Sequence, residues 1–328
     1  PLRLDYKEGL ALLNGTSVMA ATLALTVYDA EILVKTADIA LTMTLEAVGG
    51  YTEAFNERYL SLRPFKGQLE CASNVLKLVG DSKLIGENLE RTHDPYSIRC
   101  APQVHGAVRE AIKTVKNIVE TEINSIDDNP LFFSSDKAFF SGGNFHGQPL
   151  ALASDILSIA LTTLGNISER RTALLVNKRL NEILPNFLIA PEAKKGLNSG
   201  LMIPQYVAAA LASENKVLSH PASVDSIPTC ANFEDFVSMG AFAARKARLI
   251  AENVSYILSI EILCATQALE IRGVDKASSA SREVVELLRS RGVEKVVEDR
   301  PLHSDIELIS NLIRSGEVLR HVEKKVGR

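Results

Sequence analysis

The sequence predicts an all-α protein, a bundle of long, mostly antiparallel helices joined by short irregular loops. Apolar residues recur at the three-and-four spacing of a helix face over much of the chain. Residues 16–48, 148–179 and 234–271 carry apolar side chains on most faces, which is typical of helices buried inside a bundle. Turn-forming residues gather between these stretches, as expected for loops.

Residues 104–119 give the clearest one-sided helix. The apolar residues that fall on one face are Val104, Ala107, Val108, Ala111, Ile112, Val115, Ile118 and Val119. We therefore expect a helix that packs on one side only.

Two further signals predict where helices begin and end. Gly273 follows the stretch 234–271, at a place where glycine commonly stops a helix. Ser304 and Glu307 have the spacing of a capping box, which predicts a helix that starts there and ends near Gly316.

The loops suggest one hairpin and one boundary. The pairs Phe132-Phe133 and Phe139-Phe140 flank a polar turn and predict a short β-hairpin. A break near residues 273–280 divides the chain into a central helical-bundle portion, 1–275, and a small C-terminal helical portion, 276–328, packed on it.

Composition restricts the class of protein. Hydrophobic residues make up 46% of the 328 residues and charged residues 23%, so the chain can bury a sizeable core. The 36 Lys and Arg against 40 Asp and Glu leave a net charge of −4. The chain therefore lacks the excess of positive charge that is typical of proteins that bind nucleic acid or an anionic membrane. We expect neither as a partner.

The cysteines and the apolar stretches indicate a cytoplasmic protein. The four cysteines lie far apart and show no CxxC spacing, so we expect them to be reduced and mostly buried. Charged residues interrupt the most apolar stretches, which argues against a membrane span. The chain begins at Pro1 rather than Met, and we expect a processed chain or part of a longer protein.

The segment 92–99 gathers side chains suited to ligand binding just before a helix. Arg99 offers a planar fork that matches a carboxylate, and Tyr96 and His93 lie close to it in sequence. The structural alternative, favoured by spacing alone, pairs Arg99 with an Asp and places Tyr96 in the core with its hydroxyl satisfied.

Asn14-Gly15-Thr16 precedes the first long helix. Asn14 could cap that helix, which is the more common use of the residue, or its amide could point into a pocket. The sequence alone leaves both alternatives open.

Two other segments carry candidate residues. Ser141–His146 places two glycines beside Phe145 and His146, so that backbone could approach a ligand closely, although a lone histidine is more often structural. Glu234 stands at the predicted start of a helix, where the helix dipole favours a carboxylate. Alternatively, Phe233 and Phe236 could partly desolvate it and suit it to a polar substrate group.

Several kinds of site have no signature in the sequence. The histidines never pair with cysteines or carboxylates at metal-ligand spacing, and we expect no metal. A phosphate loop, a G-x-S-x-G nucleophile elbow and a GxGxxG dinucleotide fingerprint are also absent.

The order of the motifs resembles the family of aromatic amino acid ammonia-lyases and aminomutases, over essentially the whole chain. The motifs that carry the resemblance are residues 7–16, Arg63-Pro64, Gly67-Gln68, residues 94–100, Asp128-Asn129-Pro130, residues 141–146, residues 220–226, Glu234-Asp235 and residues 298–302. The resemblance implies an L-aspartase-like helical bundle, and a homotetramer in which each active site draws on three subunits.

The family's electrophile, 4-methylidene-imidazol-5-one, forms from an Ala-Ser-Gly triad, and that triad does not occur in this sequence. In family members it precedes the Asn-Gly-Thr motif, together with the tyrosine that acts as base. The resemblance is thus to a C-terminal portion, which we expect to be inactive alone and to bind the missing N-terminal segment.

Residue by residue, the resemblance implies a binding site for an amino acid. Arg99 would bind the substrate carboxylate, and Asn14 would lie near that carboxylate and the electrophile. Tyr96 would contact the electrophile and the amino group, Phe145 would pack against the substrate, and His93 belongs to the same substrate-binding loop.

Glu234 matches the carboxylate that faces the imidazole in histidine-specific members, where phenylalanine- and tyrosine-specific members have Gln. The resemblance therefore implies elimination of ammonia from L-histidine, giving trans-urocanate in the intact enzyme. Three positions depart from the family pattern: His93 replaces a common Gln, Phe233 replaces the Gln before the Glu, and Phe236 replaces a frequent His.

Other functions remain open. The runner-up is an ammonia-lyase or aminomutase for another aromatic amino acid. The fumarase and aspartase superfamily is also helical, but its serine-rich loop is absent. A non-catalytic helical scaffold is the alternative of a different class.

Overall fold

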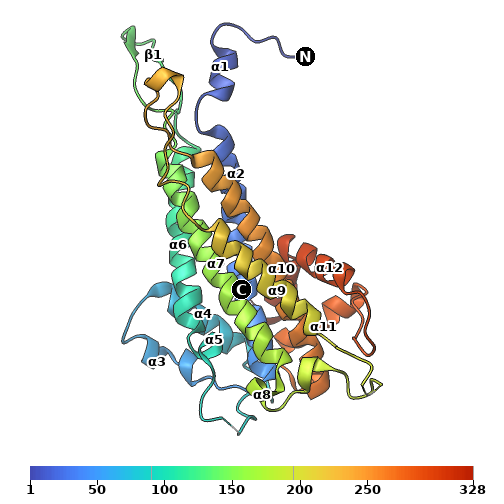
Figure 1. The fold of residues 1–328 in the computed structure, drawn as a ribbon. Coiled ribbons are helices and arrows are strands. Elements are labelled where there is room, and N and C mark those ends of the chain that lie inside the picture. Colours follow the sequence, from blue (N-terminus) through green and yellow to red (C-terminus); the bar gives the residue numbers. More distant parts are fainter. Residues whose placement is uncertain (90, 195, 328) are drawn as a thin grey trace.

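The computed structural model describes residues 1–89, 91–194 and 196–327 as an elongated bundle of helices (Figure 1). The helices are α1 (Glu8–Leu13), α2 (Ser17–Ala47), α3 (Glu57–Leu60), α4 (Lys66–Leu78), α5 (Tyr96–Arg99), α6 (Ala101–Glu122), α7 (Gln148–Val176), α8 (Lys178–Asn181), α9 (Met202–Leu218), α10 (Gly240–Arg272), α11 (Ser279–Ser290), α12 (His303–Arg314) and α13 (Glu317–Val326). The 3-10 helices are Glu53–Phe55, Asn186–Leu188, Cys230–Asn232 and Val274–Lys276, and the strands are β1 (Leu131–Phe133) and β2 (Ala138–Phe140). The expectation of an all-α bundle is confirmed.

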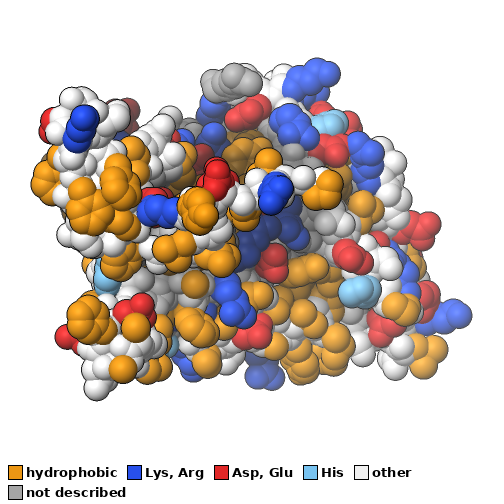
Figure 2. Space-filling view, turned by 90° about the horizontal axis from the view of Figure 1, so that it is seen from above, with side chains coloured by type: hydrophobic (Ala, Val, Ile, Leu, Met, Phe, Trp, Pro, Cys, Tyr) orange, Lys and Arg blue, Asp and Glu red, His pale blue; other side chains and the backbone are white. Residues whose placement is uncertain are grey.

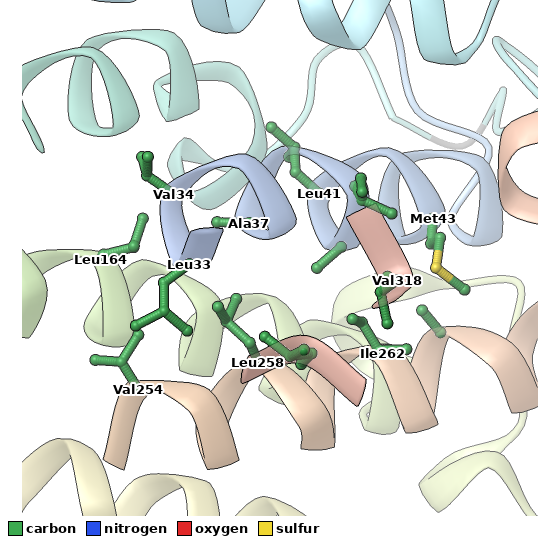
Figure 3. Close-up of a cluster of buried hydrophobic side chains, with 14 of the residues drawn as sticks. Leu33, Val34, Ala37, Leu41, Met43, Leu164, Val254, Leu258, Ile262 and Val318 are labelled. Carbon is green, nitrogen blue, oxygen red and sulfur yellow. The ribbon is translucent and has the colours of Figure 1, made fainter. Parts of the chain in front are cut away.

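The long helices α2, α7 and α10 form the centre of the bundle. They run from the hairpin end toward the opposite end, and α6 and α9 run back beside them (Figure 1). Leu33 and Leu41 of α2, Leu164 of α7 and Leu258 of α10 meet in one buried cluster, to which α13 adds Val318 (Figure 3). Each fully buried leucine stabilises the fold by about 2 kcal/mol.

Burial on several sides explains why these helices are apolar on most faces. By length and composition, the helical region Glu8–Ala47, α7 and α10 could each cross a membrane, but the most apolar windows of α7 and α10 are 72% and 78% buried inside the bundle. In Glu8–Ala47 only 28% of the most apolar window is buried. The apolar surface near the start of α2 is therefore left uncovered by this chain.

The boundaries of the predicted helices are partly confirmed. The stretch 16–48 is α2, and Gly273 ends α10 with a positive φ of 94°. The stretch 234–271 begins later than expected, at Gly240, because Met239, the N-cap of α10, has left-handed backbone with a φ of 52°. The capping box is wrong: α12 begins at His303, so Ser304 lies inside the helix and caps nothing.

The predicted hairpin is confirmed and projects from one end of the bundle (Figure 1). Phe132 pairs with Phe139 across the two strands, and their rings lie 5.1 Å apart. Phe133 and Phe140 form a second ring contact at 5.7 Å. Such cross-strand aromatic pairs stabilise the short ribbon.

The C-terminal helices are tied to the bundle through Glu46 at the end of α2. Its carboxylate accepts hydrogen bonds from the backbone and hydroxyl of Ser278, the N-cap of α11, and from the Ser281 hydroxyl. Burial raises the pKa of Glu46, although these donors act in the opposite direction. Buried hydrogen bonds thus connect the two portions of the chain on either side of the boundary predicted near residue 275.

All four cysteines are free, but only Cys71 and Cys264 are buried. Cys100 is partly exposed and Cys230 is exposed. The expectation that the cysteines are mostly buried therefore holds for half of them.

Candidate active site

The single turn α5 holds the first group of predicted site residues. Pro95 is its N-cap, and Pro102 lies in the first turn of α6. Proline has no amide hydrogen, so the backbone ladder is interrupted where α5 meets α6. Tyr96 and Arg99 therefore stand on a turn separate from the long helix that follows.

The Arg99 side chain is free of the structural partner that the alternative interpretation required. Its guanidinium lies over the Tyr96 ring, 4.5 Å from the centroid. The Arg99 Nε is buried and has no hydrogen-bond partner among the described residues, and none of their carboxylates forms an ion pair with Arg99. A guanidinium held like this is available for a ligand carboxylate.

A cleft opens beside this guanidinium. It has a volume of about 540 Å³ and is lined in part by Arg99, Arg63, Gln68 and Gln103. Tyr96 is 68% exposed, so it is not a core residue, which was the structural alternative for it. His93 is exposed too, and its Nδ1 lies 3.0 Å from the Thr92 hydroxyl.

Asp94, whose role the sequence did not indicate, anchors the loop before α5. Its buried carboxylate accepts a hydrogen bond of 2.7 Å from the Tyr51 amide and pairs with Arg91 at 3.2 Å. Burial raises the pKa of Asp94, and the Tyr51 amide and Arg91 offset part of that effect. In the sequence Asp-Pro-Tyr, Asp94 thus fixes the loop to the bundle, and Pro95 and Tyr96 begin α5.

Asn14 lies at the other end of the bundle, just before α2 (Figure 1). It does not cap α2. The Asp127 carboxylate does so instead, accepting hydrogen bonds from the Thr16 amide at 2.6 Å and the Thr16 hydroxyl at 2.9 Å. Gly15 has a φ of 131°, and a Cβ there would lie 2.7 Å from an Asp127 oxygen. The Asn14 side chain is left with no hydrogen bond to any part of the chain that the structure describes.

Glu234 lies in the loop before α10, so the helix-dipole explanation for it is wrong. It forms an isolated β-bridge with Thr229, and its carboxylate accepts a hydrogen bond from the Thr229 hydroxyl. Cys230, Ala231 and Asn232, which follow Thr229, all have positive φ. This backbone conformation costs free energy in non-glycine residues. This loop is held in a strained shape that presents Glu234 at the surface.

The aromatic neighbours of Glu234 do not enclose it within this chain. Phe233 is 93% exposed. Phe236 stacks on His146 with the ring centroids 5.9 Å apart, and its carbonyl lies 3.2 Å from His146 Nε2. This contact joins the loop of Glu234 to the segment that carries Phe145.

The two groups of predicted residues lie at opposite ends of α7. Ser97 of α5 lies near Arg171 in the last turns of α7, with its carbonyl 3.4 Å from the guanidinium. Gly147, at the start of α7, lies beside Met19 and Gly240 at the end that holds Asn14 and Glu234. At 1.5 Å per residue these ends are about 35 Å apart, so one copy of the chain does not bring the two groups together.

The buried groups Asp38, Cys71 and His105 have ligand atoms within 4.8 Å of one another. The Asp38 carboxylate, however, already accepts hydrogen bonds from His105 at 2.8 Å, Arg109 at 2.6 Å and Cys71 at 3.2 Å. Burial raises the pKa of the Cys71 thiol well above its ordinary value, which disfavours the thiolate that a metal would need. This cluster is a hydrogen-bonded network around a carboxylate.

Comparison with known proteins agrees with the order of these motifs. The family model described as aromatic amino acid lyase matches residues 1–290. The chain belongs to the aromatic amino acid lyase family. The histidine ammonia-lyase of Caldanaerobacter subterraneus is 53% identical over 318 residues, and that of Symbiobacterium thermophilum is 50% identical over 328 residues.

Solved structures of the family share the fold. Histidine ammonia-lyase from Trypanosoma cruzi has a TM-score of 0.90 and 44% identity, covering 99% of this chain and 61% of its own. Tyrosine aminomutase from Streptomyces globisporus has a TM-score of 0.93 and 38% identity, covering 100% of this chain and 66% of its own. The alignments cover 97% and 100% of this chain, but only 62% and 64% of the length of the two bacterial relatives.

Proposed function

We propose that the full-length protein carrying this chain is a histidine ammonia-lyase, which eliminates ammonia from L-histidine to give trans-urocanate. The observation that carries the proposal is the Arg99 guanidinium beside a cleft, with a buried Nε and no ion-pair partner among the described residues. Relatives with 53% and 50% identity bear the name histidine ammonia-lyase. The four free cysteines agree with action in the reducing cytoplasm.

The side chains divide the work of binding and orientation. Arg99 binds the substrate carboxylate with two parallel hydrogen bonds, which fixes the amino acid backbone. Glu234 accepts a hydrogen bond from the imidazole N–H, and Phe145 packs against the ring. We assign His93, in the loop before α5, to the groups that contact substrate.

Tyr96 and Asn14 are the residues that would hold the 4-methylidene-imidazol-5-one of this family. Both present polar side-chain atoms without partners in the described chain, as such a role requires. The group supplies an electrophile for the substrate's amino function, which is otherwise a poor leaving group. No Ala-Ser-Gly triad occurs in the 328 residues, so the proposal concerns the full-length protein.

Assembly brings the two ends of the bundle together. We propose a homotetramer whose active sites combine α5 of one copy with the Asn14 and Glu234 end of others. Exposed apolar side chains follow the outer faces of the long helices and include Leu25, Tyr28, Leu152, Ile156, Ile159, Phe242 and Leu249. Uncovered apolar faces of this kind mark association surfaces. The end-on view also shows hydrophobic groups exposed among charged ones (Figure 2).

An aminomutase is the second candidate, because tyrosine aminomutase superimposes with a TM-score of 0.93. The two reactions differ in product: a lyase releases ammonia and an unsaturated acid, whereas an aminomutase returns an amino acid. A non-catalytic scaffold would give neither product.

The test is the kinetics of Arg99 variants of the full-length protein. Arg99→Lys keeps the charge but loses the planar fork of the guanidinium. We expect a lower kcat/KM for histidine, equivalent to a loss of about 1.5–3 kcal/mol of transition-state stabilisation. Arg58→Lys, at an exposed arginine of α3 that does not line the cleft, is the matched control. Unchanged kinetics in Arg99→Lys would remove Arg99 from the site.

A further inference from the structure

Arg171 is the largest of the fully buried side chains in the part of the chain that the structure describes. A buried guanidinium is stable only when its charge and its N–H groups are satisfied. The Glu261 carboxylate of α10 satisfies one edge, accepting Arg171 Nε at 2.5 Å and Nη2 at 2.9 Å. The same carboxylate accepts the Thr44 hydroxyl at 2.9 Å and the Ser168 hydroxyl at 2.6 Å. The pair is therefore complete and rigid.

The remaining nitrogen of Arg171 points away from this pair. Nη1 lies 3.4 Å from the Ser97 carbonyl and 3.4 Å from His105 Nε2. Ser97 lies inside α5, between Tyr96 and Arg99. His105 Nδ1 in turn lies 2.8 Å from Asp38, so the far side of Nη1 is also fixed.

The turn α5 needs such a contact. Its ladder of backbone hydrogen bonds is interrupted at Pro102, so the following helix does not hold it by itself. Ile98 is fully buried and anchors one face. The Arg171 contact reaches the backbone of Ser97, next to Tyr96 and close to Arg99 in the same turn.

We propose that Arg171 is a positioning residue for Tyr96 and Arg99, acting through the Ser97 carbonyl, an inference that rests on the proposed function. Arg171 touches no substrate. Its planar fork binds Glu261 with one edge and leaves Nη1 for Ser97, a division of donors that the single ammonium of lysine cannot reproduce.

Arg171→Lys in the full-length protein tests this role, with Arg289→Lys as the matched control. Arg289 uses its donors in the same way: Nε and Nη2 bind Glu270 at 2.8 Å each, and Nη1 binds the Val293 carbonyl. No contact joins it to α5 in the described residues. If Arg171→Lys does not fold, the double variant Arg171→Met/Glu261→Met removes the buried pair as a unit and still lacks the Ser97 contact.

Two readouts separate positioning from loss of stability. Hydrogen exchange of the peptide that covers α5 should be at least about tenfold faster in Arg171→Lys than in Arg289→Lys. KM for histidine should rise about tenfold, while the inhibition constant of histamine, which lacks the carboxylate, should change less than about twofold.

Equal exchange in the two variants would overturn the inference, and so would a matched loss of histidine and histamine binding. A wild-type protein that produces no urocanate would overturn the proposed function instead. In that case, faster exchange of α5 confined to Arg171→Lys would still support its hold on this turn.

Discussion

The Asp127 carboxylate caps α2 at a point where Gly15 leaves room for it. Thr16 donates two hydrogen bonds to this carboxylate, and a side chain at Gly15 would collide with it. A helix N-terminus is stabilised by a carboxylate of this kind, because its first amides have no partner within the helix. Asn14 is thereby spared from capping.

Gly15→Ala should lower the free energy of unfolding by about 2 kcal/mol or more. The added Cβ meets Asp127, and alanine is strained at a φ of 131°. Chemical denaturation measures the change. Gly142→Ala is the control, because nothing lies within 4 Å of a Cβ at Gly142. Equal stability of the two variants would contradict the capping role of Asp127.

The network around Asp38 should make stability depend on pH. Burial lowers the pKa of His105, although Asp38 acts in the opposite direction. A histidine with a depressed pKa contributes stability that is present above its unfolded value of about 6.5 and lost as the pH falls below it. Asp38 adds to this only in strong acid, because its own pKa is lowered: burial raises it, but Arg109 and His105 prevail.

We therefore expect the midpoint temperature of thermal unfolding to decrease as the pH is lowered from about 7.5 to about 5.5. His105→Gln should make this decrease smaller. The comparison of slopes is independent of how much the variant is destabilised overall. His303→Gln is the control, because His303 is exposed. A slope that His105→Gln leaves unchanged would show that another group titrates.

Glu46→Ala should loosen the C-terminal helices first. The substitution leaves the Ser278 amide and the hydroxyls of Ser278 and Ser281 without their acceptor, at a cost of about 1–3 kcal/mol. Limited proteolysis should cut within residues 276–328 before it cuts the bundle. Glu283→Ala, which loses a partly exposed contact with His321, is the control. Simultaneous cleavage of both portions would argue against a separate C-terminal unit.

Co-expression of two inactive variants tests the sharing of sites between copies. Arg99→Met damages the α5 end and Glu234→Ala damages the other end, so a mixed oligomer contains some sites in which both groups are intact. Activity should reappear in the mixture. Light scattering should show a tetramer, and a monodisperse monomer or a mixture without activity would contradict the shared site.

The sequence predicted the fold well because helical periodicity and burial agree along α2, α6 and α7. It failed where long-range contacts decide the outcome. Asp127, far from Thr16 in sequence, took the capping role that a local rule gave to Asn14, and left-handed residues before Gly240 shortened the helix predicted from 234.

The site residues were suggested by resemblance, and their distribution between two ends was not visible in the sequence. Arg171 was missed as well. The charged run Glu169-Arg170-Arg171 inside an apolar helix was the available signal, because a charge on a buried face needs a partner.

Product formation by the full-length protein, measured with histidine and phenylalanine side by side, tests the central claim most directly. In the proposed site the Glu234 carboxylate accepts a hydrogen bond from the imidazole N–H in addition to that from Thr229. A phenyl ring offers no donor, so the desolvated carboxylate would lack this second hydrogen bond, at a cost of about 1–3 kcal/mol. We expect urocanate and ammonia from histidine, a marked preference over phenylalanine, and a larger loss for histidine in Glu234→Gln. Equal turnover of both amino acids, or a ratio that Glu234→Gln leaves unaltered, would contradict the account.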